Sequence, residues 1–151
     1  MHDLQTKKMR LTRYTDYALR VLLYLGHDQA RLCSIAEIAR AYAISRNHLM
    51  KVVNDLVNAG YLESVRGRTG GIRLARPPAE INVGALIRHT EDDFDLVECG
   101  ACLIAPACGA TSVLDEALGA FMTVLNGYSL ADMLARKGNF SYLLRSQAAA
   151  R

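Results

Sequence analysis

The chain has 151 residues, of which 51% are hydrophobic, and a formal net charge of +3. This length allows one compact domain, or a small globular head with a helical appendage. No apolar run reaches membrane-spanning length, because Arg20 interrupts the most apolar segment, 17–25. The first eight residues lack the apolar core of a secretory signal. We therefore expect a cytoplasmic protein with no membrane partner.

Charge is unevenly distributed along the chain. Residues 1–76 hold thirteen Lys/Arg and six Asp/Glu, whereas residues 77–151 hold five and nine. The first half is therefore basic and the second half is acidic. A basic half indicates that one end of the protein meets a polyanion, and a merely solvated basic surface is the alternative.

Residues 11–59 predict three successive helices. Apolar side chains recur every three or four residues, and Ser, Thr and Gly stand where helices typically begin and end. The expected helices with their N-cap residues are 11–26 with Thr12 or Thr15, 35–42 with Ser34, and 46–59 with Ser45. Only two residues separate the second helix from the N-cap of the third, as in a helix-turn-helix.

A basic hairpin follows the third helix. Residues 61–65 and 72–75 alternate between apolar and polar side chains as strands do, and the turn 66–71 contains three glycines. Two prolines then end this unit. Three helices and a hairpin in this order predict a mainly α protein whose head, residues 1–78, is a winged helix-turn-helix.

The helix after the turn is the one that would enter the major groove of DNA. Its N-terminal end and the hairpin offer side chains suited to base edges and phosphates. The predicted DNA-binding residues are Ser45, Arg46, Asn47, His48 and Lys51 on the helix, and Arg66, Arg68 and Arg73 on the hairpin. A protein-binding module is the alternative, but charge, helices and hairpin together favour double-stranded DNA.

The second half of the chain predicts a helical appendage, residues 79–136. A short helix is expected over 82–90, and residues 112–125 carry a wide apolar stripe. A stripe this wide on a helix remote from the head is typical of a homodimer interface, and packing against the chain's own head is the alternative. A further short helix ends at Leu134, and we expect the tail, 137–151, to be frayed.

Three of the four cysteines, Cys99, Cys102 and Cys108, lie within ten residues. In a reducing compartment such clustering favours a metal over disulfides, and thiolates favour a soft metal or an iron–sulfur cluster. Zinc usually has four protein ligands in two pairs, and no fourth cysteine or histidine follows at the expected interval. Three thiolates and one ligand of a different kind fit a 2Fe–2S or 4Fe–4S cluster in which one iron is chemically distinct from the others. Idle thiols are the alternative, and we expect Cys33 to be a packed free thiol.

Five segments carry a resemblance to a bacterial family of winged-helix, iron–sulfur-dependent repressors that includes NsrR, IscR and RirA. Residues 9–20 (MRLTRYTDYALR) are similar to the start of the family, and residues 44–53 and 65–71 are similar to its recognition helix and wing. Residues 102–108 (CLIAPAC) and 125–132 (LNGYSLAD) resemble the NsrR branch in particular. The resemblance covers most of the chain.

The resemblance implies a homodimeric repressor that senses nitric oxide through its cluster. It implies that Cys99, Cys102 and Cys108 are ligands, and that Asp16 from the first helix of the other subunit is the fourth. The alternative for Asp16 is that its charge complements the helix dipole. The chain departs from the family in two ways. The two-residue gap between the first two cysteines is shorter than usual, and Thr111 stands where the IscR branch has a histidine.

The implied mechanism links the cluster to the spacing of the two heads. The ligand from the other subunit would hold the recognition helices about 34 Å apart, as a palindromic operator requires. Nitric oxide would displace Asp16, shift the heads and release the DNA. A RirA-like response to iron or oxidation is the second hypothesis. An iron–sulfur enzyme or electron carrier is disfavoured, because no acid/base group or nucleotide loop accompanies the cysteines.

Overall fold

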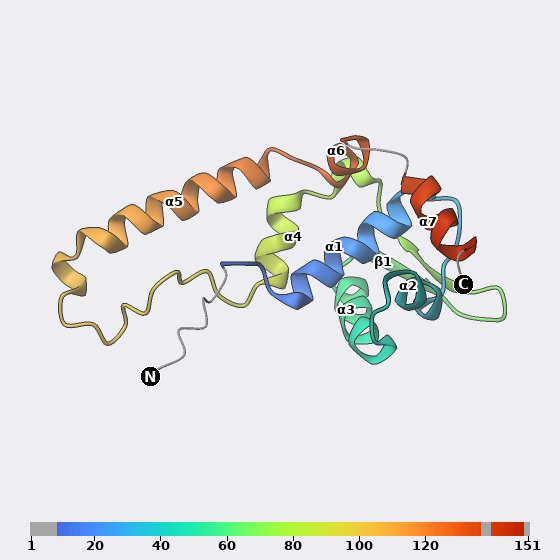
Figure 1. Ribbon diagram of the computed structural model, residues 1–151, viewed down its shortest axis with the longest axis horizontal. Coiled ribbons are helices and arrows are strands. Elements are labelled where there is room, and N and C mark those ends of the chain that lie inside the picture. Colours follow the sequence, from blue (N-terminus) through green and yellow to red (C-terminus); the bar gives the residue numbers. More distant parts are fainter. Residues whose placement is uncertain (1–8, 137–139, 150–151) are drawn as a thin grey trace.

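The structure is a computed structural model, which describes residues 9–136 and 140–149 (Figure 1). It is mainly helical with a single small hairpin over these ranges, which confirms the predicted fold class. The elements in chain order are α1 (Arg13–Gly26), α2 (Ile35–Tyr42), α3 (Arg46–Asn58), β1 (Leu62–Val65), β2 (Gly71–Leu74), the 3-10 helix η1 (Pro78–Glu80), α4 (Val83–Thr90), the 3-10 helix η2 (Ala105–Ala107), α5 (Gly109–Asn126), α6 (Leu130–Ala135) and α7 (Phe140–Ala149).

The head is built around α1. Its apolar positions recur at helical spacing, so Ala18, Val21, Leu22 and Leu25 lie on one face and are buried. This face packs against α3, α4, α6 and β2. Thr12, one of the two predicted N-cap residues, caps this helix, because its hydroxyl accepts a hydrogen bond from the Thr15 amide at 3.3 Å; the helix itself begins at Arg13 rather than at residue 11.

A tight turn joins α2 to α3. Ala43 adopts the left-handed conformation (φ 55°), and the amide of Ile44 donates to the carbonyl of Ala39 at 2.9 Å. Ser34 caps α2 as predicted. Ser45 is the N-cap residue of α3, as predicted, although its side chain makes no capping hydrogen bond. The backbone carbonyl of Ser45 accepts a hydrogen bond from the Leu49 amide, and no backbone amide donates to the Ser45 hydroxyl.

The hairpin pairs Leu62 with Leu74 and Val65 with Gly71. A third segment extends it, because Cys33 and Ile72 exchange backbone hydrogen bonds of 3.1 and 2.8 Å. Gly71 has a φ of 155°, and a side chain there would lie 2.7 Å from the Cys33 carbonyl oxygen. Cys33 is 2% exposed and makes no disulfide, so the prediction of a packed free thiol is confirmed.

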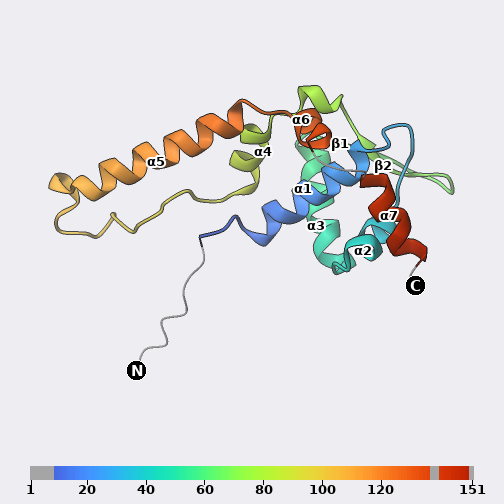
Figure 2. The same cartoon turned by 45° about the horizontal axis from the view of Figure 1, so that its top comes forward.

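The segment 91–108 runs outward from the head, and helix α5 returns beside it toward the head (Figures 1 and 2). The junction is tight, because the Asn82 side-chain amide donates to the Asn126 carbonyl at 2.7 Å and a side chain at position 84 would clash with Asn126. No residue of α5 is buried. The helix contacts α4 at this junction, and a homodimer interface along its apolar stripe stays a prediction. The helix also begins at residue 109, earlier than the predicted 112.

The last two helices lie against the head. Ser129 and Asp132 form a capping box at the start of α6. The expectation of a frayed tail is wrong for residues 140–149, which form α7. This helix contacts α2, and Leu144 packs against the core of the head. The rest of the predicted tail, 137–139 and 150–151, lies outside the described residues.

Candidate DNA-binding surface and cysteine site

The N-terminal end of α3 is exposed at the surface of the head. The apolar stripe of this helix, Leu49, Val52, Val53 and Leu56, is buried, as predicted. The remaining side chains therefore project outward. The predicted DNA-binding residues of α3 are all exposed: Ser45, Arg46, Asn47, His48 and Lys51. A helix placed in this way can present two cations and an amide to base edges.

The three arginines of the wing differ in their surroundings. Arg66 and Arg68 lie exposed at the turn, and neither forms an ion pair within the part of the chain that the structure describes. Arg73 instead contacts Glu63 across the hairpin, with Nε 3.0 Å from Oε2. This hydrogen bond lowers the pKa of Glu63. Because the pair neutralises Arg73, we expect Arg66 and Arg68 to make the main phosphate contacts of the wing.

Cys99 and Cys108 both lie near the first turn of α5. The Sγ of Cys99 is 3.3 Å from the hydroxyl oxygen of Thr111. Cys108 is the N-cap residue of α5, and the backbone amides of Thr111 and Ala110 point toward its sulfur without a full capping bond. These amides lower the pKa of the Cys108 thiol. A lower pKa favours the thiolate, which is the form that binds metals.

The cysteine segment is a chain of short turns with exposed apolar residues. The Cys102 amide donates to the Cys99 carbonyl at 3.1 Å, and the Ala105 amide donates to the Cys102 carbonyl at 3.2 Å. Cys102 is exposed, and the neighbouring Leu103 is 95% exposed. Such exposure leaves this side of the loop accessible to another molecule.

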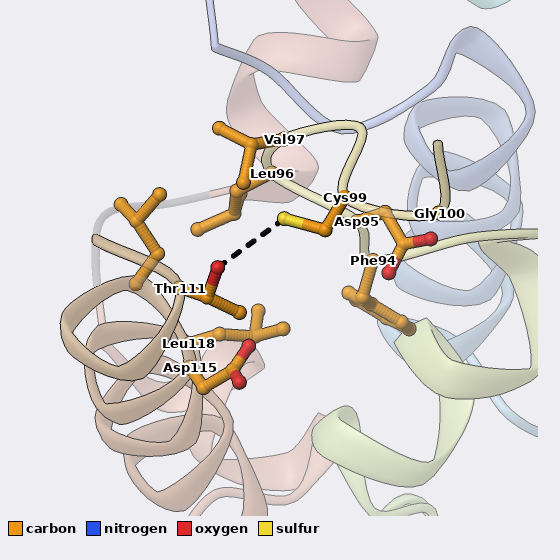
Figure 3. Close-up of a pocket in the computed structure, with 10 residues that line it drawn as sticks. Phe94, Asp95, Leu96, Val97, Cys99, Gly100, Thr111, Asp115 and Leu118 are labelled. Atoms are coloured by element: carbon orange, nitrogen blue, oxygen red, sulfur yellow. Dashed lines mark hydrogen bonds between the residues drawn. The ribbon is translucent and has the colours of Figure 1, made fainter. Parts of the chain in front are cut away.

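A cavity of about 290 Å³ separates the cysteine segment from α5 (Figure 3). Its apolar walls come from Phe94, Leu96 and Val97 on the segment, and from Leu114 and Leu118 on the helix. The Cys99 sulfur points across this space toward Thr111 (Figure 3). The packing of the segment against α5 is therefore loose apart from this contact.

The donor set is suited to an iron–sulfur cluster, although the thiols are not assembled. Two of the three predicted cysteine ligands approach one helix end: Cys99 contacts the Thr111 hydroxyl there, and backbone amides lower the pKa of the Cys108 thiol. Cys102 stands apart on the exposed loop, and no three His, Cys, Asp or Glu side chains of residues 9–136 and 140–149 are grouped so that they could hold a metal ion. The three cysteine ligands remain a prediction.

Asp16, the predicted fourth ligand, lies in the first turn of α1. Its carboxylate accepts two hydrogen bonds from Arg20, at 2.9 and 3.0 Å. The Asp16 side chain is 47% exposed, so another molecule can reach it. Within this chain Asp16 is therefore a half-exposed ion-pair partner one helical turn from Arg20.

Sequence reasoning missed Glu91, which caps α1 from a distance. Its Oε1 accepts from the Thr12 amide at 2.8 Å and from the Thr12 hydroxyl at 2.9 Å. The buried Thr15 hydroxyl also donates to this carboxylate, and lies 2.8 Å from the hydroxyl oxygen of Thr90. The network joins the end of α4, where the cysteine segment starts, to the turn that carries Asp16. The only signal in the sequence was the acidic run that begins at Glu91.

A winged helix-turn-helix head with an exposed basic helix defines the class of DNA-binding transcriptional regulators. The chain belongs to the Rrf2 family, described as "Iron-dependent Transcriptional regulator", whose model matches residues 11–136. It is therefore a regulator and not an enzyme, as expected. Nor does any helix in the described ranges have the length and apolar character needed to cross a membrane.

The relatives agree with this assignment. The HTH-type transcriptional regulator NsrR of Bacillus licheniformis is 49% identical over 142 residues, which cover 90% of this chain and 99% of that protein. The NsrR of Bacillus subtilis is 48% identical over 143 residues, covering 91% and 98%. The predicted resemblance to the NsrR branch is confirmed.

Two solved structures share the fold. The structure of T. potens IscR has a TM-score of 0.70 and 26% identity, and the match covers 91% of this chain and 98% of that one. The oxidized form of Staphylococcus aureus CymR has a TM-score of 0.71 and 27% identity, with coverage of 87% and 100%. The family match over residues 11–136 includes the elements from α1 to α6, α5 among them.

Proposed function

We propose that this regulator is a homodimeric repressor whose iron–sulfur cluster senses nitric oxide and thereby controls operator binding. The observation that carries the proposal is the position of the cysteines. Cys99 and Cys108 lie at the start of α5, a long helix whose apolar face is uncovered. A sensor placed there is well situated to affect how two heads are held together.

The uncovered face of α5 supports the homodimer. Val113, Phe121 and Val124 are 64%, 45% and 60% exposed. Apolar exposure of this extent along one helix is costly in water unless a partner covers it. A second copy of the same helix provides a matching apolar face, and two-fold symmetry suits a palindromic operator.

The residues proposed to hold the cluster are Cys99, Cys102 and Cys108 of one subunit and Asp16 of the partner subunit. A cluster bound in this way would contain one iron with a weak, exchangeable oxygen ligand, and that iron would be open to reaction with nitric oxide. The thiolates anchor the group to the loop and to the end of α5. The carboxylate connects it to the α1 helix of the other head.

Arg20 gives Asp16 an alternative partner. When Asp16 is not a ligand, its carboxylate pairs with Arg20 of its own helix, as the bidentate contact indicates. Release of Asp16 therefore leaves no uncompensated charge. The two arrangements provide the two states that any allosteric release of DNA requires.

The proposal is tested with protein purified without oxygen. Iron and sulfide content should identify a cluster, and cluster-loaded protein should select a palindromic site from a random DNA library. Nitric oxide should change the visible spectrum and weaken binding to that site. If nitric oxide changed neither the visible spectrum nor the affinity for this site, the protein would not be a nitric oxide sensor.

An iron-responsive regulator is the second candidate, and the iron-dependent description of the family favours it. The same DNA assay separates the two. Iron chelation without nitric oxide should release DNA if iron supply is the signal. If nitric oxide releases the DNA rapidly and iron chelation releases it slowly or not at all, the nitric oxide sensor is supported.

A further inference from the structure

We propose that Thr111 is a positioning residue of the cysteine site, whose hydroxyl holds the Cys99 sulfur against the start of α5. This inference rests on the proposed function, because it concerns how the cluster ligands are arranged. The two residues are twelve positions apart, and the contact between Sγ and Oγ1 is 3.3 Å (Figure 3). The sequence identified Thr111 only as a position without a histidine.

This contact is the one hydrogen bond between segment 92–107 and α5 in the described structure. The other hydrogen bonds of the segment connect neighbouring residues, such as Cys102 with Cys99 and Cys108 with Ala105. Apolar packing does not replace it, because the cavity of about 290 Å³ separates the two walls and Leu96 and Val97 are 42% and 45% exposed. The hydroxyl therefore determines where Cys99 lies relative to the helix.

Helical geometry places Thr111 where it can act on two sulfurs. It is the third residue of α5, so its backbone amide faces the N-cap residue Cys108 while its hydroxyl contacts Cys99. A ligating thiolate carries no hydrogen. The Thr111 hydroxyl must then be the donor to the Cys99 sulfur, and hydrogen bonds to ligand sulfurs raise cluster stability and shift the reduction potential.

The test compares three variants of the full-length protein loaded with cluster. Thr111→Val removes the hydroxyl at nearly constant shape, and Thr111→Ser keeps it. Thr123→Val is the matched control, because Thr123 is an exposed threonine of the same helix whose hydroxyl, among the described residues, bonds only to the Gly119 carbonyl. The measurements are the rate of cluster loss to a chelator, followed by absorbance without oxygen, and the midpoint potential.

Thr111→Val should lose its cluster about tenfold faster than wild type, the lower end of the range for residues that orient metal ligands. It should also shift the midpoint potential, and Thr111→Ser and Thr123→Val should match wild type in both measurements. Equal loss rates and potentials for Thr111→Val and wild type would overturn this inference while the cluster proposal stands. Wild-type protein that binds no cluster would overturn the proposed function instead.

Discussion

Arg46 is the first residue of α3 and belongs to the exposed end that we assign to the major groove. Replacing it with alanine should weaken binding to the selected site by about 1–3 kcal/mol and relax specificity at one base position. Arg46→Lys keeps the charge but loses the bidentate donor pair, so it should lose specificity and keep most non-specific affinity. Fluorescence anisotropy on specific and scrambled DNA measures both. An equal loss on the two DNAs would make Arg46 a phosphate contact.

The cysteines allow a sharper test at the same scale. Single substitutions Cys99→Ala, Cys102→Ala and Cys108→Ala should each abolish or strongly reduce the iron and sulfide content of anaerobically purified protein. Cys33→Ala is the control, because Cys33 is buried in the head beside the wing. Iron content that falls equally in all four variants would indicate a general folding defect rather than lost ligands.

Residue type alone identified the cysteines and the basic side chains, because their chemistry is recognisable without a fold. The roles of Thr111 and Glu91 could not be predicted in this way. A hydroxyl or a carboxylate becomes important through the atoms that the fold brings to it, and Glu91 meets Thr12 across 79 positions. The pairing of Arg73 with Glu63 was missed for the same reason, since it depends on the strand register.

At the scale of elements, the Glu91 network should stabilise the start of α1. Glu91→Gln keeps the shape of the side chain but removes the negative charge of the carboxylate. This carboxylate accepts hydrogen bonds from Thr12 and Thr15 at the N-terminus of α1. We expect the free energy of unfolding to fall by about 1 kcal/mol, measured by urea denaturation. Asp92→Asn, one position later and with no hydrogen bond of its own among the described residues, is the matched control. Equal stability of the two variants would contradict the role of Glu91.

Helices α1, α2 and α4 were predictable because each has a strong apolar period and an N-cap side chain that accepts a capping hydrogen bond. Helix α2 was predicted with its observed bounds, and Asn82 caps α4 through the Ala85 amide. The start of α5 was missed because Gly109 and Ala110 carry no periodic signal. Helix α7 was missed because its apolar side chains are scattered, and its contact with α2 depends on the tertiary structure.

At the scale of the whole molecule, the apolar face of α5 should hold two copies together. Phe121→Glu places a charge on that face and should weaken dimerisation at least tenfold, since burying an unpaired charge is costly. Thr123→Glu introduces the same charge two residues later, about 200° around the helix, and should leave the dimer intact. Sedimentation velocity over a concentration series measures both. Identical behaviour of the two variants would place the interface elsewhere.

We propose that nitric oxide acting at the cysteine site releases DNA. The most direct test of this claim is anaerobic anisotropy of cluster-loaded wild-type protein on its selected palindromic site, with nitric oxide added in steps. We expect affinity to fall in proportion to the loss of the cluster spectrum, and the metal-free Cys102→Ala protein to bind weakly and ignore nitric oxide. Tight binding that persists after the cluster spectrum has gone would contradict the claim.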